Sequence, residues 1–556
     1  MVSALGGVTD LLLNAATLAS EKQDTYKEIV QSIETRHLDT VKKLIPVAGQ
    51  SAVLSHVKRE LNRLETLLDG CSLLGELSER TKDLIVSFGE MLSSYIISEA
   101  LKAQGEDAAL ADSRELIQTN SRFGKASVDF DATNKLIFDY FERSEKKITV
   151  MPGFIAKSAD GHTTTLGRGG SDYTAAIIAA ALEVPSLEIW TDVNGIYTAN
   201  PKLVKQAEPI PYITFEEAME LSHFGAKVLY APTIQPILNK DITLHIKNTF
   251  EPEAHGSVVS KVPEVKSDNP IRGISNVDNT TLITLEGPGM VGVAGFSKRL
   301  FDVISKENVS VIFITQASSE HSICLGIADS EAAKAEAAIN AEFGFEIQQG
   351  KIYPAIIENG LSIIAVVGEN MKNHQGLSGR MFSSLGKNNI NIRAIAQGAS
   401  ERNISAVIDS KDVKKALNTL HETFFEDATV QLNLFVMGVG NVGEKFIDQI
   451  QKQAQYLRNN LHINVRIAGL ANSRTMYFDE EGIDLDNWKA LLPQGEPSNF
   501  DGFVHKIKAL NLRNSIFVDN TASHEVAATY AQYLKNSIGV VTCNKVCLLY
   551  TSDAAD

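Results

Sequence analysis

Residues Thr163 to Asp172 form the segment of the chain that is richest in chemically useful groups. These ten residues include three threonines, three glycines, Arg168 and Asp172, and a helix is expected at 173–182. Glycines let backbone N–H groups approach an anion, and a helix N-terminus adds positive partial charge at the same place. Arg168 can hold a carboxylate or phosphate through two parallel hydrogen bonds. We therefore predict a site for a small anionic substrate or a phosphate rather than a plain glycine-rich turn.

A second glycine pattern lies near the end of the chain. Gly438, Gly440 and Gly443 follow an apolar strand expected at 432–437 and precede a helix expected at 444–457. In that context the glycines form a tight turn, admit a pyrophosphate and pack helix on strand. The pattern predicts a Rossmann domain that binds a dinucleotide.

The strand after that helix bears on the choice of cofactor. It ends in Ala471-Asn-Ser-Arg474, with no acidic residue to meet a ribose hydroxyl. Arg474 could instead meet a 2′-phosphate, so the sequence favours NADP over NAD. Taken alone, Arg474 is about as well explained as a solvated loop residue.

The middle of the chain contains an internal repeat. Residues 316–323 are echoed by residues 397–404, 81 positions later, and Gln316 and Gln397 are equivalent. The repeat predicts two small, similar modules that pack side by side and make related sites. Both amides could bind a small molecule. The alternative is that they are polar turn residues at a module interface.

Bulk properties exclude several classes of protein. At 556 residues the chain is long enough for three or four domains, and its net charge of −16 argues against nucleic-acid binding. We find no run long and apolar enough to cross a bilayer, and the opening residues lack the basic start of a signal peptide. The four cysteines show no CxxC spacing, and we expect a reduced, cytoplasmic protein.

The first 262 residues alternate turns, short apolar strands and amphipathic helices, as in an α/β domain. We expect buried strands at 148–152 and 187–190 and a helix at 54–74. Thr214 and Glu217 match a capping box that begins a later helix. Residues 251–269 are rich in Pro, Ser and charge, and we expect a linker there.

With these parts in this order, the chain resembles the bifunctional aspartokinase–homoserine dehydrogenases. The resemblance is carried by the segments Ser3–Asp10, Phe88–Glu90, Thr163–Asp172, Trp190–Asp192, Gly195–Tyr197 and Phe224–Lys227. It implies an α/β chain with an amino-acid-kinase-like three-layer domain at 1–262, tandem ACT (α+β) modules at 263–431 and a Rossmann domain at 432–545. Residues 546–556 read as an unrelated tail. A homo-oligomer without nucleic-acid or membrane partners is also implied.

For the kinase, the resemblance implies that Arg168 holds the aspartate α-carboxylate while Glu90 and Asp172 meet its ammonium group. Ser3, Thr9 and Ser171 would add hydrogen bonds. Arg168, Asp172 and Lys227 would be the catalytic residues. Without the family pattern, Glu90 would be a helix cap or a solvated residue.

For the nucleotide, the resemblance implies ATP with Mg²⁺ and no metal site built from protein residues alone. The ATP contacts would be Thr191, Asp192, Tyr197, Lys202 and Lys227. Lys202 occupies a position where the family often has arginine. A lysine ammonium group there would bind phosphate as a single charge rather than through the two parallel hydrogen bonds of a guanidinium. Taken singly, the lysines would be surface charges and Tyr197 a core aromatic.

For the dehydrogenase, the resemblance implies NADP or NAD and the substrate aspartate semialdehyde. The cofactor contacts would be Gly438, Gly440, Asn441, Val442, Gly443, Arg474, Thr521 and Lys545. In the ACT modules, threonine is the expected effector, in contact with Gln316 and Gln397.

The chain departs from the family pattern at both ends. It has no Lys-Phe-Gly-Gly-Thr loop, and it leaves the pattern after Lys545, before the substrate domain of the dehydrogenase. We therefore expect a fragment of a longer protein without either activity of its own. Two other hypotheses are an amino-acid-sensing regulatory protein that catalyses nothing and a monofunctional aspartokinase. The fingerprint at 438–443 argues against the last.

Overall fold

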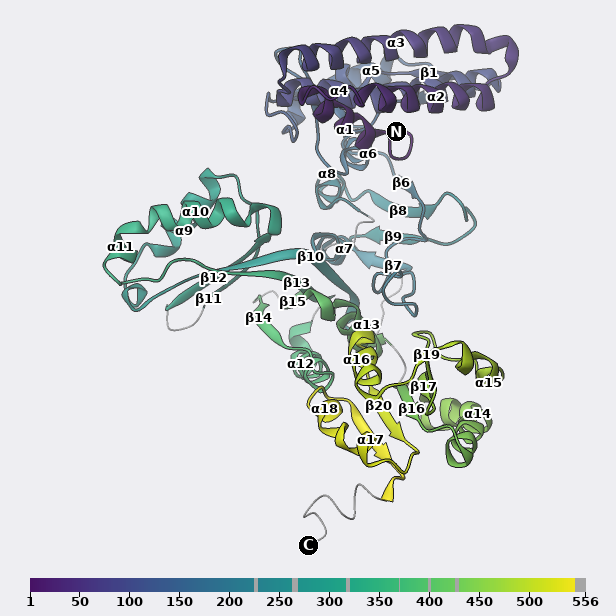
Figure 1. Ribbon diagram of the computed structural model, residues 1–556. Coiled ribbons are helices and arrows are strands. Elements are labelled where there is room, and N and C mark those ends of the chain that lie inside the picture. The colour runs from purple at the N-terminus through teal and green to yellow at the C-terminus, as the bar shows by residue number, and fades with distance from the viewer. Residues whose placement is uncertain are drawn as a thin grey trace. The chain divides into compact units, whose positions relative to one another are not determined.

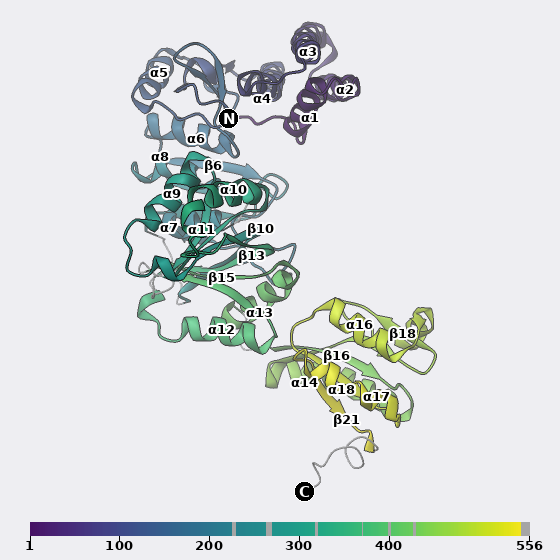
Figure 2. The same ribbon diagram turned by 60° about the vertical axis from the view of Figure 1, so that its left-hand side comes forward.

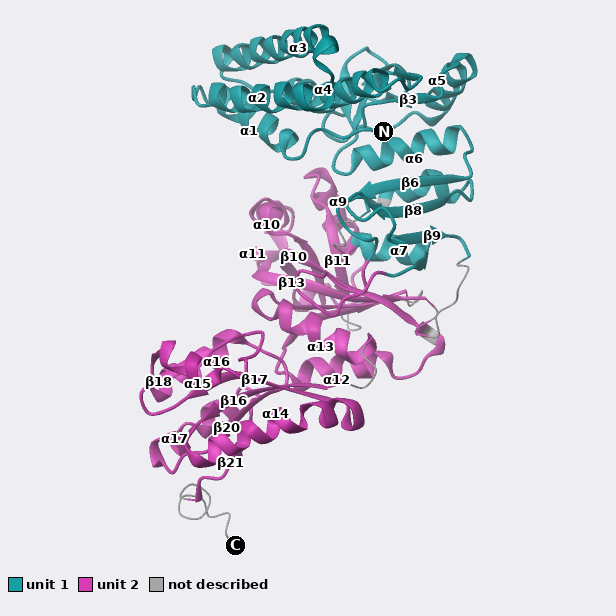
Figure 3. Cartoon of the chain, turned by 90° about the vertical axis from the view of Figure 1, so that its right-hand side faces the viewer, with its two compact units in different colours: residues 1–196, 210–223, 227–266 teal, residues 197–209, 224–226, 267–556 magenta. Residues whose placement is uncertain are grey.

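The computed structural model describes most of the chain as two compact units (Figures 1 and 3). The described residues are 1–224, 229–262, 269–316, 321–369, 371–398, 402–425 and 430–545. The first unit comprises residues 1–196, 210–223 and 227–266, and the second comprises residues 197–209, 224–226 and 267–556. The segment 197–209 thus packs with the regulatory and C-terminal parts of the chain.

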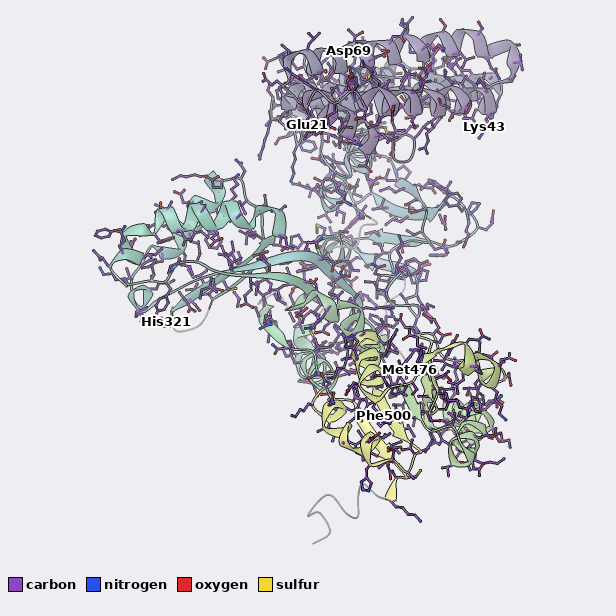
Figure 4. The ribbon with its side chains drawn as sticks, viewed as in Figure 1. Glu21, Lys43, Asp69, His321, Met476 and Phe500 are labelled. Carbon is purple, nitrogen blue, oxygen red and sulfur yellow. The ribbon has the colours of Figure 1, made fainter. Side chains whose placement is uncertain are left out.

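Four helices share one core at the start of the first unit: α1 (Val8–Ser20), α2 (Tyr26–Leu44), α3 (Val47–Leu74) and α4 (Glu79–Ala103). The predicted helix at 54–74 is confirmed as the larger part of α3, and Val57, Leu61, Leu64 and Leu68 are buried as its spacing required. Tyr26 donates a hydrogen bond of 2.5 Å to Asp69 (labelled in Figure 4), which ties α2 to α3.

Helix α4 differs from the expectation that no segment is long and apolar enough to cross a membrane. By length and composition it is apolar enough to cross a membrane, so the expectation that no such run exists was wrong. However, 67% of its apolar window is buried inside the protein. Phe88, Leu92 and Ile96 belong to the four-helix core, which accounts for the apolar composition of α4 without a bilayer.

Short strands and two helices follow α4. A parallel pair joins β1 (Ala108–Leu110) to β3 (Ile148–Val150), and a three-stranded sheet has the order β2 (Gln118–Thr119), β4 (Ile155–Ser158), β5 (Thr163–Thr165). The helices are α5 (Phe130–Arg143) and α6 (Gly170–Ala181), and α6 confirms the helix expected after the glycine-rich segment. The strand expected at 148–152 is present as β3, with Met151 and Pro152 buried beyond it.

A four-stranded sheet completes the first unit in the order β6 (Ser186–Thr191), β8 (Thr243–Asn248), β9 (Ser257–Ser260), β7 (Tyr212–Thr214). The expectation of a buried strand at 187–190 was wrong, because β6 is an edge strand whose Trp190 is 46% exposed. The expected linker at 251–269 was also wrong in part, because it contains β9 between β8 and β7.

Two short helices, α7 (Phe215–His223) and α8 (Ile234–Leu238), accompany this sheet. The capping box is confirmed at the start of α7. The Glu217 carboxylate accepts from the Thr214 backbone N–H at 2.9 Å, and the Glu217 N–H donates to the Thr214 hydroxyl at 3.2 Å.

The second unit contains a six-stranded antiparallel sheet in the order β11-β12-β10-β13-β15-β14. Its strands are β10 (Ile271–Glu286), β11 (Val311–Gln316), β12 (Ser322–Ala328), β13 (Ile356–Gly368), β14 (Ile392–Gln397) and β15 (Asn403–Asp409). The first repeat adds helices α9 (Phe296–Lys306), α10 (Ala332–Glu342) and α11 (Gly344–Gln348), and the second adds α12 (Leu377–Lys387) and α13 (Val413–Phe425) (Figure 2).

The repeat seen in the sequence is therefore present as a strand–helix–strand–strand–helix unit in each half. The two halves are less separate than expected, because β10 and β13 each run through both of them. Residues 271–277 of β10 pair with the second half of β13, and residues 280–286 pair with β12 of the first repeat. A register shift between Val277 and Thr280 marks the boundary. The modules share a continuous sheet rather than a contact between separate sheets.

The C-terminal part of this unit is a second six-stranded sheet in the order β19-β18-β17-β16-β20-β21. Strands β16 (Val430–Met437), β17 (Ile463–Ala471), β20 (Ser515–Asp519) and β21 (Gly539–Thr542) are parallel, and β18 (Thr475–Phe478) and β19 (Glu496–Pro497) extend the edge antiparallel. The helices are α14 (Asn441–Leu461), α15 (Trp488–Leu491), α16 (Phe500–Leu510), α17 (His524–Ala528) and α18 (Tyr530–Leu534). Met476, labelled in Figure 4, belongs to its core. The Rossmann prediction is confirmed.

Candidate functional sites

The glycine-rich segment forms the end of β5 and the turn into α6. Gly167 and Gly169 have φ of 79° and 70°, and a Cβ at Gly169 would overlap the side chain of Tyr230. Both positions therefore require glycine. Arg168, between them, is exposed, while Asp172 lies in the first turn of α6. The turn thus presents a cation and a helix N-terminus side by side, as the sequence predicted.

Asp83 on α4 holds this segment in place, although the sequence analysis did not single it out. Its carboxylate accepts from the Thr165 N–H at 3.0 Å, the Thr165 hydroxyl at 2.8 Å and the Gly124 N–H at 2.9 Å. Asp83 is 2% exposed, and burial raises the pKa of its carboxyl, although these hydrogen bonds oppose the shift. A sequence signal did exist, because an acid seven residues before Glu90 falls on the same apolar face of the helix.

Residues Val2 to Ala4 connect α4 to the strand end at 151–153. The Val2 N–H donates to the Met151 carbonyl, and the Gly153 N–H donates to the Val2 carbonyl, both at 2.9 Å. From the other side, the Ser93 hydroxyl on α4 donates to the Ser3 carbonyl at 2.7 Å. Gly89 allows this close approach, because a Cβ there would lie 2.9 Å from the Ala4 Cβ.

The same contacts gather several predicted aspartate ligands. Glu90 follows Gly89 and accepts a hydrogen bond from the Ala4 backbone. Gly153 lies directly against Ser171, since a Cβ at Gly153 would come within 2.6 Å of the Ser171 Cβ. Ser3, Ser171 and Asp172 line one cavity of about 430 Å³. Thr9 lies in the first turn of α1, and neither Thr9, Glu90 nor Arg168 lines that cavity.

Two carboxyl groups of this region, the buried Glu90 and the half-buried Asp172, have no ion-pair partner among the described residues. Glu90 is 3% exposed, and its Oε2 has no hydrogen-bond partner among the described residues. Burial raises the pKa of Glu90 to about 7 and the pKa of Asp172 to about 6. Removing a carboxylate from water costs free energy unless a positive charge pairs with it. A ligand with a positive charge would therefore bind favourably beside these two groups.

The predicted nucleotide residues fall into three groups. Thr191 and Asp192 lie where the parallel strands β6 and β8 end, and the Thr249 N–H donates to the Thr191 carbonyl at 2.8 Å. Tyr197 and Lys202 belong to the second unit, so their expected continuity with Thr191 stays a prediction. Lys227 lies outside the described residues.

The glycine turn of the Rossmann domain has a clear steric basis. A Cβ at Gly443 would overlap the carbonyl oxygen of Gly438, and Gly438 has φ of 93° against Asn520. By contrast, a Cβ at Gly440 would meet no atom of the chain within 4 Å. The first and third glycines are thus required by the fold, whereas the second leaves space in front of the exposed Asn441 and Val442 at the start of α14. This open cradle fits a cofactor pyrophosphate.

Asp519 organises the other loops at the carboxyl edge of this sheet and was also missed by the sequence analysis. It is fully buried and accepts from the Thr521 N–H at 2.7 Å, the Tyr530 hydroxyl at 2.6 Å and Asn544 Nδ2 at 3.2 Å. Thr521 and Lys545 are therefore carried by loops fixed to one carboxylate. Their predicted contacts with the cofactor are not tested by this geometry.

Arg474 lies in the turn between β17 and β18. The Asn472 carboxamide oxygen accepts from the backbone N–H groups of Arg474 and Thr475 at 2.7 and 2.8 Å. This turn leaves the Arg474 side chain exposed beyond the end of β17, at the position where a ribose contact is expected in this fold.

Gln316 and Gln397 end β11 and β14, the two outer strands of the regulatory sheet, and both are exposed. These strands nevertheless contact each other. The Ser378 hydroxyl donates to Gln397 Oε1 at 3.1 Å. The polar turn after Gln316, residues 317–320, lies outside the described residues.

The fold and these sites define a protein with an amino-acid-kinase domain, a paired ACT module and a dinucleotide-binding domain. The amino acid kinase family matches residues 1–248, the ACT domain matches residues 283–343 and 364–424, and the NAD-binding domain of homoserine dehydrogenase matches residues 438–554. A kinase domain implies ATP, and the last match implies a nicotinamide cofactor.

Curated relatives match the chain over nearly its whole length. The chain is 34% identical over 551 residues to a chloroplastic bifunctional aspartokinase/homoserine dehydrogenase of Zea mays, covering 98% of this chain and 60% of that protein. It is 36% identical to the Haemophilus influenzae bifunctional enzyme, covering 98% of this chain and 67% of that protein. The chain belongs to the bifunctional aspartokinase/homoserine dehydrogenase family and spans 60% of the length of the maize relative.

Solved structures agree with this assignment. Escherichia coli aspartokinase III in complex with aspartate and ADP aligns with a TM-score of 0.68 at 30% identity, covering 76% of this chain and 92% of that one. The same enzyme with lysine and aspartate aligns with a TM-score of 0.58.

The glycine turn yields a testable contrast. We expect Gly443→Ala to lower the stability of the C-terminal domain by about 1–3 kcal/mol, because the new methyl overlaps the Gly438 carbonyl. Gly440→Ala should leave the melting temperature nearly unchanged but weaken cofactor binding about tenfold or more, because the methyl fills the cradle. Thermal unfolding and NADPH fluorescence titration measure the two effects. Equal behaviour of the two variants would contradict this division of roles.

Proposed function

We propose that this protein transfers the γ-phosphoryl group of ATP to the side-chain carboxylate of L-aspartate, giving 4-phospho-L-aspartate and ADP. We propose that its second activity reduces aspartate semialdehyde to homoserine with a nicotinamide cofactor. The observation that carries the first proposal is a pair of carboxyl groups, the buried Glu90 and the half-buried Asp172, which have no cation among the described residues. An amino-acid substrate supplies the missing positive charge.

The substrate groups and the predicted residues are complementary. The ammonium group of aspartate would be held by Glu90 and Asp172, while the exposed guanidinium of Arg168 would hold its α-carboxylate. The Ser3 and Ser171 hydroxyls can donate to the substrate or accept from it. With both charged groups of its α-carbon held, aspartate has its side-chain carboxylate free to attack the γ-phosphorus atom. The bond between that phosphorus and the bridging oxygen breaks as the new bond forms, and ADP leaves.

Phosphoryl transfer depends on positioning and on positive charge rather than on covalent help from the protein. We propose that ATP is used as its Mg²⁺ complex, in which the ion neutralises the phosphate oxygens. Thr191 and Asp192, at the ends of two parallel strands, are placed where an open α/β sheet binds ligands. Tyr197, Lys202 and Lys227 are proposed to complete the nucleotide site.

In the dehydrogenase part, the bound nicotinamide would supply a hydride to the aldehyde carbon. The glycine turn and α14 would bind the pyrophosphate, and the loops fixed by Asp519 would orient Thr521 and Lys545. We propose a preference for NADP, because no carboxylate follows β17 and Arg474 is exposed there.

We propose threonine as the effector of the ACT modules, with Gln316 and Gln397 as contacts. The two glutamines occupy equivalent positions at the ends of β11 and β14, and these two strands contact each other, which supports this proposal. An amino-acid effector matches the domain type, and its identity is a matter for binding measurements.

Arg168 offers the most direct test of the kinase site. In a longer form of the protein that has both activities, we expect Arg168→Ala to lower kcat/KM for aspartate phosphorylation by about 10- to 150-fold, the equivalent of about 1.5–3 kcal/mol for a charge-assisted hydrogen-bond pair. The hydroxamate assay for aspartyl phosphate measures this loss. NADPH affinity should stay within about twofold of the original value. Parallel loss of both functions would argue against two separate sites.

Glu90 should make aspartate binding depend on pH. Only an ionised carboxylate pairs with an ammonium group, so Glu90, with a pKa of about 7, should make affinity fall about tenfold from about pH 8 to about pH 6. Asp172, with a pKa of about 6, should add about twofold, which gives about twentyfold in the unaltered protein. Glu90→Gln should bind more weakly at the higher pH and lose most of this dependence, keeping about twofold from Asp172.

Calorimetry with aspartate measures these affinities, and Glu99→Gln is the matched control. Glu99 lies on the same helix but pairs with Lys102 at 2.7 Å, so this variant should retain the original pH profile. A pH-independent affinity in the unaltered protein would remove Glu90 from the site.

The effector proposal is tested by calorimetry with threonine and lysine. Gln316→Ala and Gln397→Ala should each weaken threonine binding about fivefold or more, since each loses about 1 kcal/mol of hydrogen bonding. Gln349→Ala, an exposed change in the same unit, should have no effect. Binding of lysine without threonine would reassign the effector.

A further inference from the structure

We propose that the second unit contains a binding site for a small phosphate-bearing anion that is centred on Lys415 and Arg466 and includes no residue of the cofactor or effector sites. The site is a cavity of about 370 Å³ lined by residues of the 202–206 segment, helix α13 and the C-terminal domain. This volume is in the usual range for small-molecule sites. The inference does not depend on the proposed activities.

The cavity is strongly cationic in a chain whose net charge is −16. Seven of its lining residues are lysines or arginines, and two are glutamates. Both glutamates are already engaged, because Glu481 pairs with Lys205 at 2.7 Å and Glu480 pairs with Lys414. Lys411 pairs outward with Asp409 at 2.9 Å, and Arg513 pairs with Glu422 at 2.7 Å.

Of the seven cations, three have no ion pair among the described residues: Lys202, which is exposed and already assigned to the proposed nucleotide site, and the half-buried Lys415 and Arg466. Lys415 and Arg466 are each held by a neutral amide instead. Lys415 Nζ donates to Asn511 Oδ1 at 3.2 Å, and Arg466 Nε donates to Asn433 Oδ1 at 2.9 Å. These bonds orient the two side chains without neutralising them.

Burial makes this arrangement unfavourable in the absence of an anion. The pKa values of Lys415 and Arg466 are both lowered, chiefly because burial disfavours their charged forms, although Asp412 opposes the shift at Lys415 and Glu481 opposes it at Arg466. Gly482 packs closely on the Arg466 side chain, since a Cβ there would come within 2.5 Å of Arg466 Cγ. The guanidinium is therefore fixed, and its free N–H groups can bind phosphate oxygens in parallel.

A phosphate-bearing ligand matches these features better than a monocarboxylate. The planar guanidinium of Arg466 and the ammonium group of Lys415 can share the several oxygens of a phosphate chain, whereas one carboxylate would use only one of these cations. Such a ligand could be an inorganic polyphosphate or the phosphate chain of a nucleotide. Both share the chemistry recognised here.

The cavity also lies where the regulatory sheet meets the C-terminal domain. Asn511, which orients Lys415, also donates to Asp412 at the start of α13 with a distance of 2.7 Å. A ligand held by Lys415 and Arg466 would therefore bridge a regulatory helix and strand β17 of the Rossmann sheet. Binding at this place would stabilise one arrangement of the two parts.

Hydrogen exchange of the whole chain with inorganic pyrophosphate locates the site. We expect slower exchange at 509–513 and in α13 on adding pyrophosphate, and much weaker protection with inorganic phosphate or malonate. The double variant Lys415→Gln/Arg466→Gln should lose this protection and weaken pyrophosphate binding by about tenfold or more in calorimetry. Lys489→Gln, a lysine of the same domain paired with Glu444, should keep both.

The single variants Lys415→Gln and Lys415→Arg cover the case in which the double variant does not fold. The arginine variant keeps the charge and should retain the protection that the glutamine variant loses. Adding ADP after pyrophosphate has saturated the protein distinguishes a nucleotide from an inorganic polyphosphate as the natural ligand. Further protection from exchange at 509–513 indicates a nucleotide site, and no further protection indicates a site for an inorganic ligand. Protection confined to the loops at 163–172 and 438–443, or protection unchanged in Lys415→Gln, would overturn the proposal.

Discussion

The cost of burying a carboxylate governs the architecture of the first unit. Helix α4 buries two acids, Asp83 and Glu90, on one face. Asp83 receives three hydrogen bonds from the protein and so fixes the glycine-rich segment to the helix. Glu90 is less well satisfied by hydrogen bonds, because its Oε2 has no hydrogen-bond partner in the described structure. One acid is thus satisfied by the fold, while the other is left for a ligand.

The same distinction separates structure from function in the second unit. Asp519 is satisfied by backbone, tyrosine and asparagine donors, so its role is to hold loops together. Lys415 and Arg466 are hydrogen-bonded to neutral amides, and neither has an ion-pair partner among the described residues. Whether a buried charge has its counter-charge inside the protein is therefore a better guide to a binding site than burial alone.

Local patterns made much of this fold predictable. The helix at 54–74, the capping box at Thr214 and the strand–glycine–helix unit at 432–457 all depend on residues within a turn or two of one another. The errors came from long-range pairing. The composition of segment 187–190 indicates a buried strand, yet within the described sheet β6 lies at the edge and pairs with β8 on one side. Strand β9 lies in a segment whose composition indicates a linker. Asp83 and Asp519 were missed because their partners are distant in sequence: Thr165 lies 82 residues from Asp83, and Asn544 lies 25 from Asp519.

The shared strands of the regulatory sheet explain why its two modules need not act independently. A separate module can change its packing without moving its neighbour, but β10 and β13 each belong to both modules. A shift of either strand must be accommodated in both halves, because a register change of one residue would turn every buried side chain outward. The second half also carries α13, and Asp412, directly before this helix, contacts the C-terminal domain by accepting a hydrogen bond from Asn511. A ligand at the strand ends of one module thus has a continuous path of backbone pairing and packed helix to the Rossmann sheet, and a bistable step anywhere along it would couple the two.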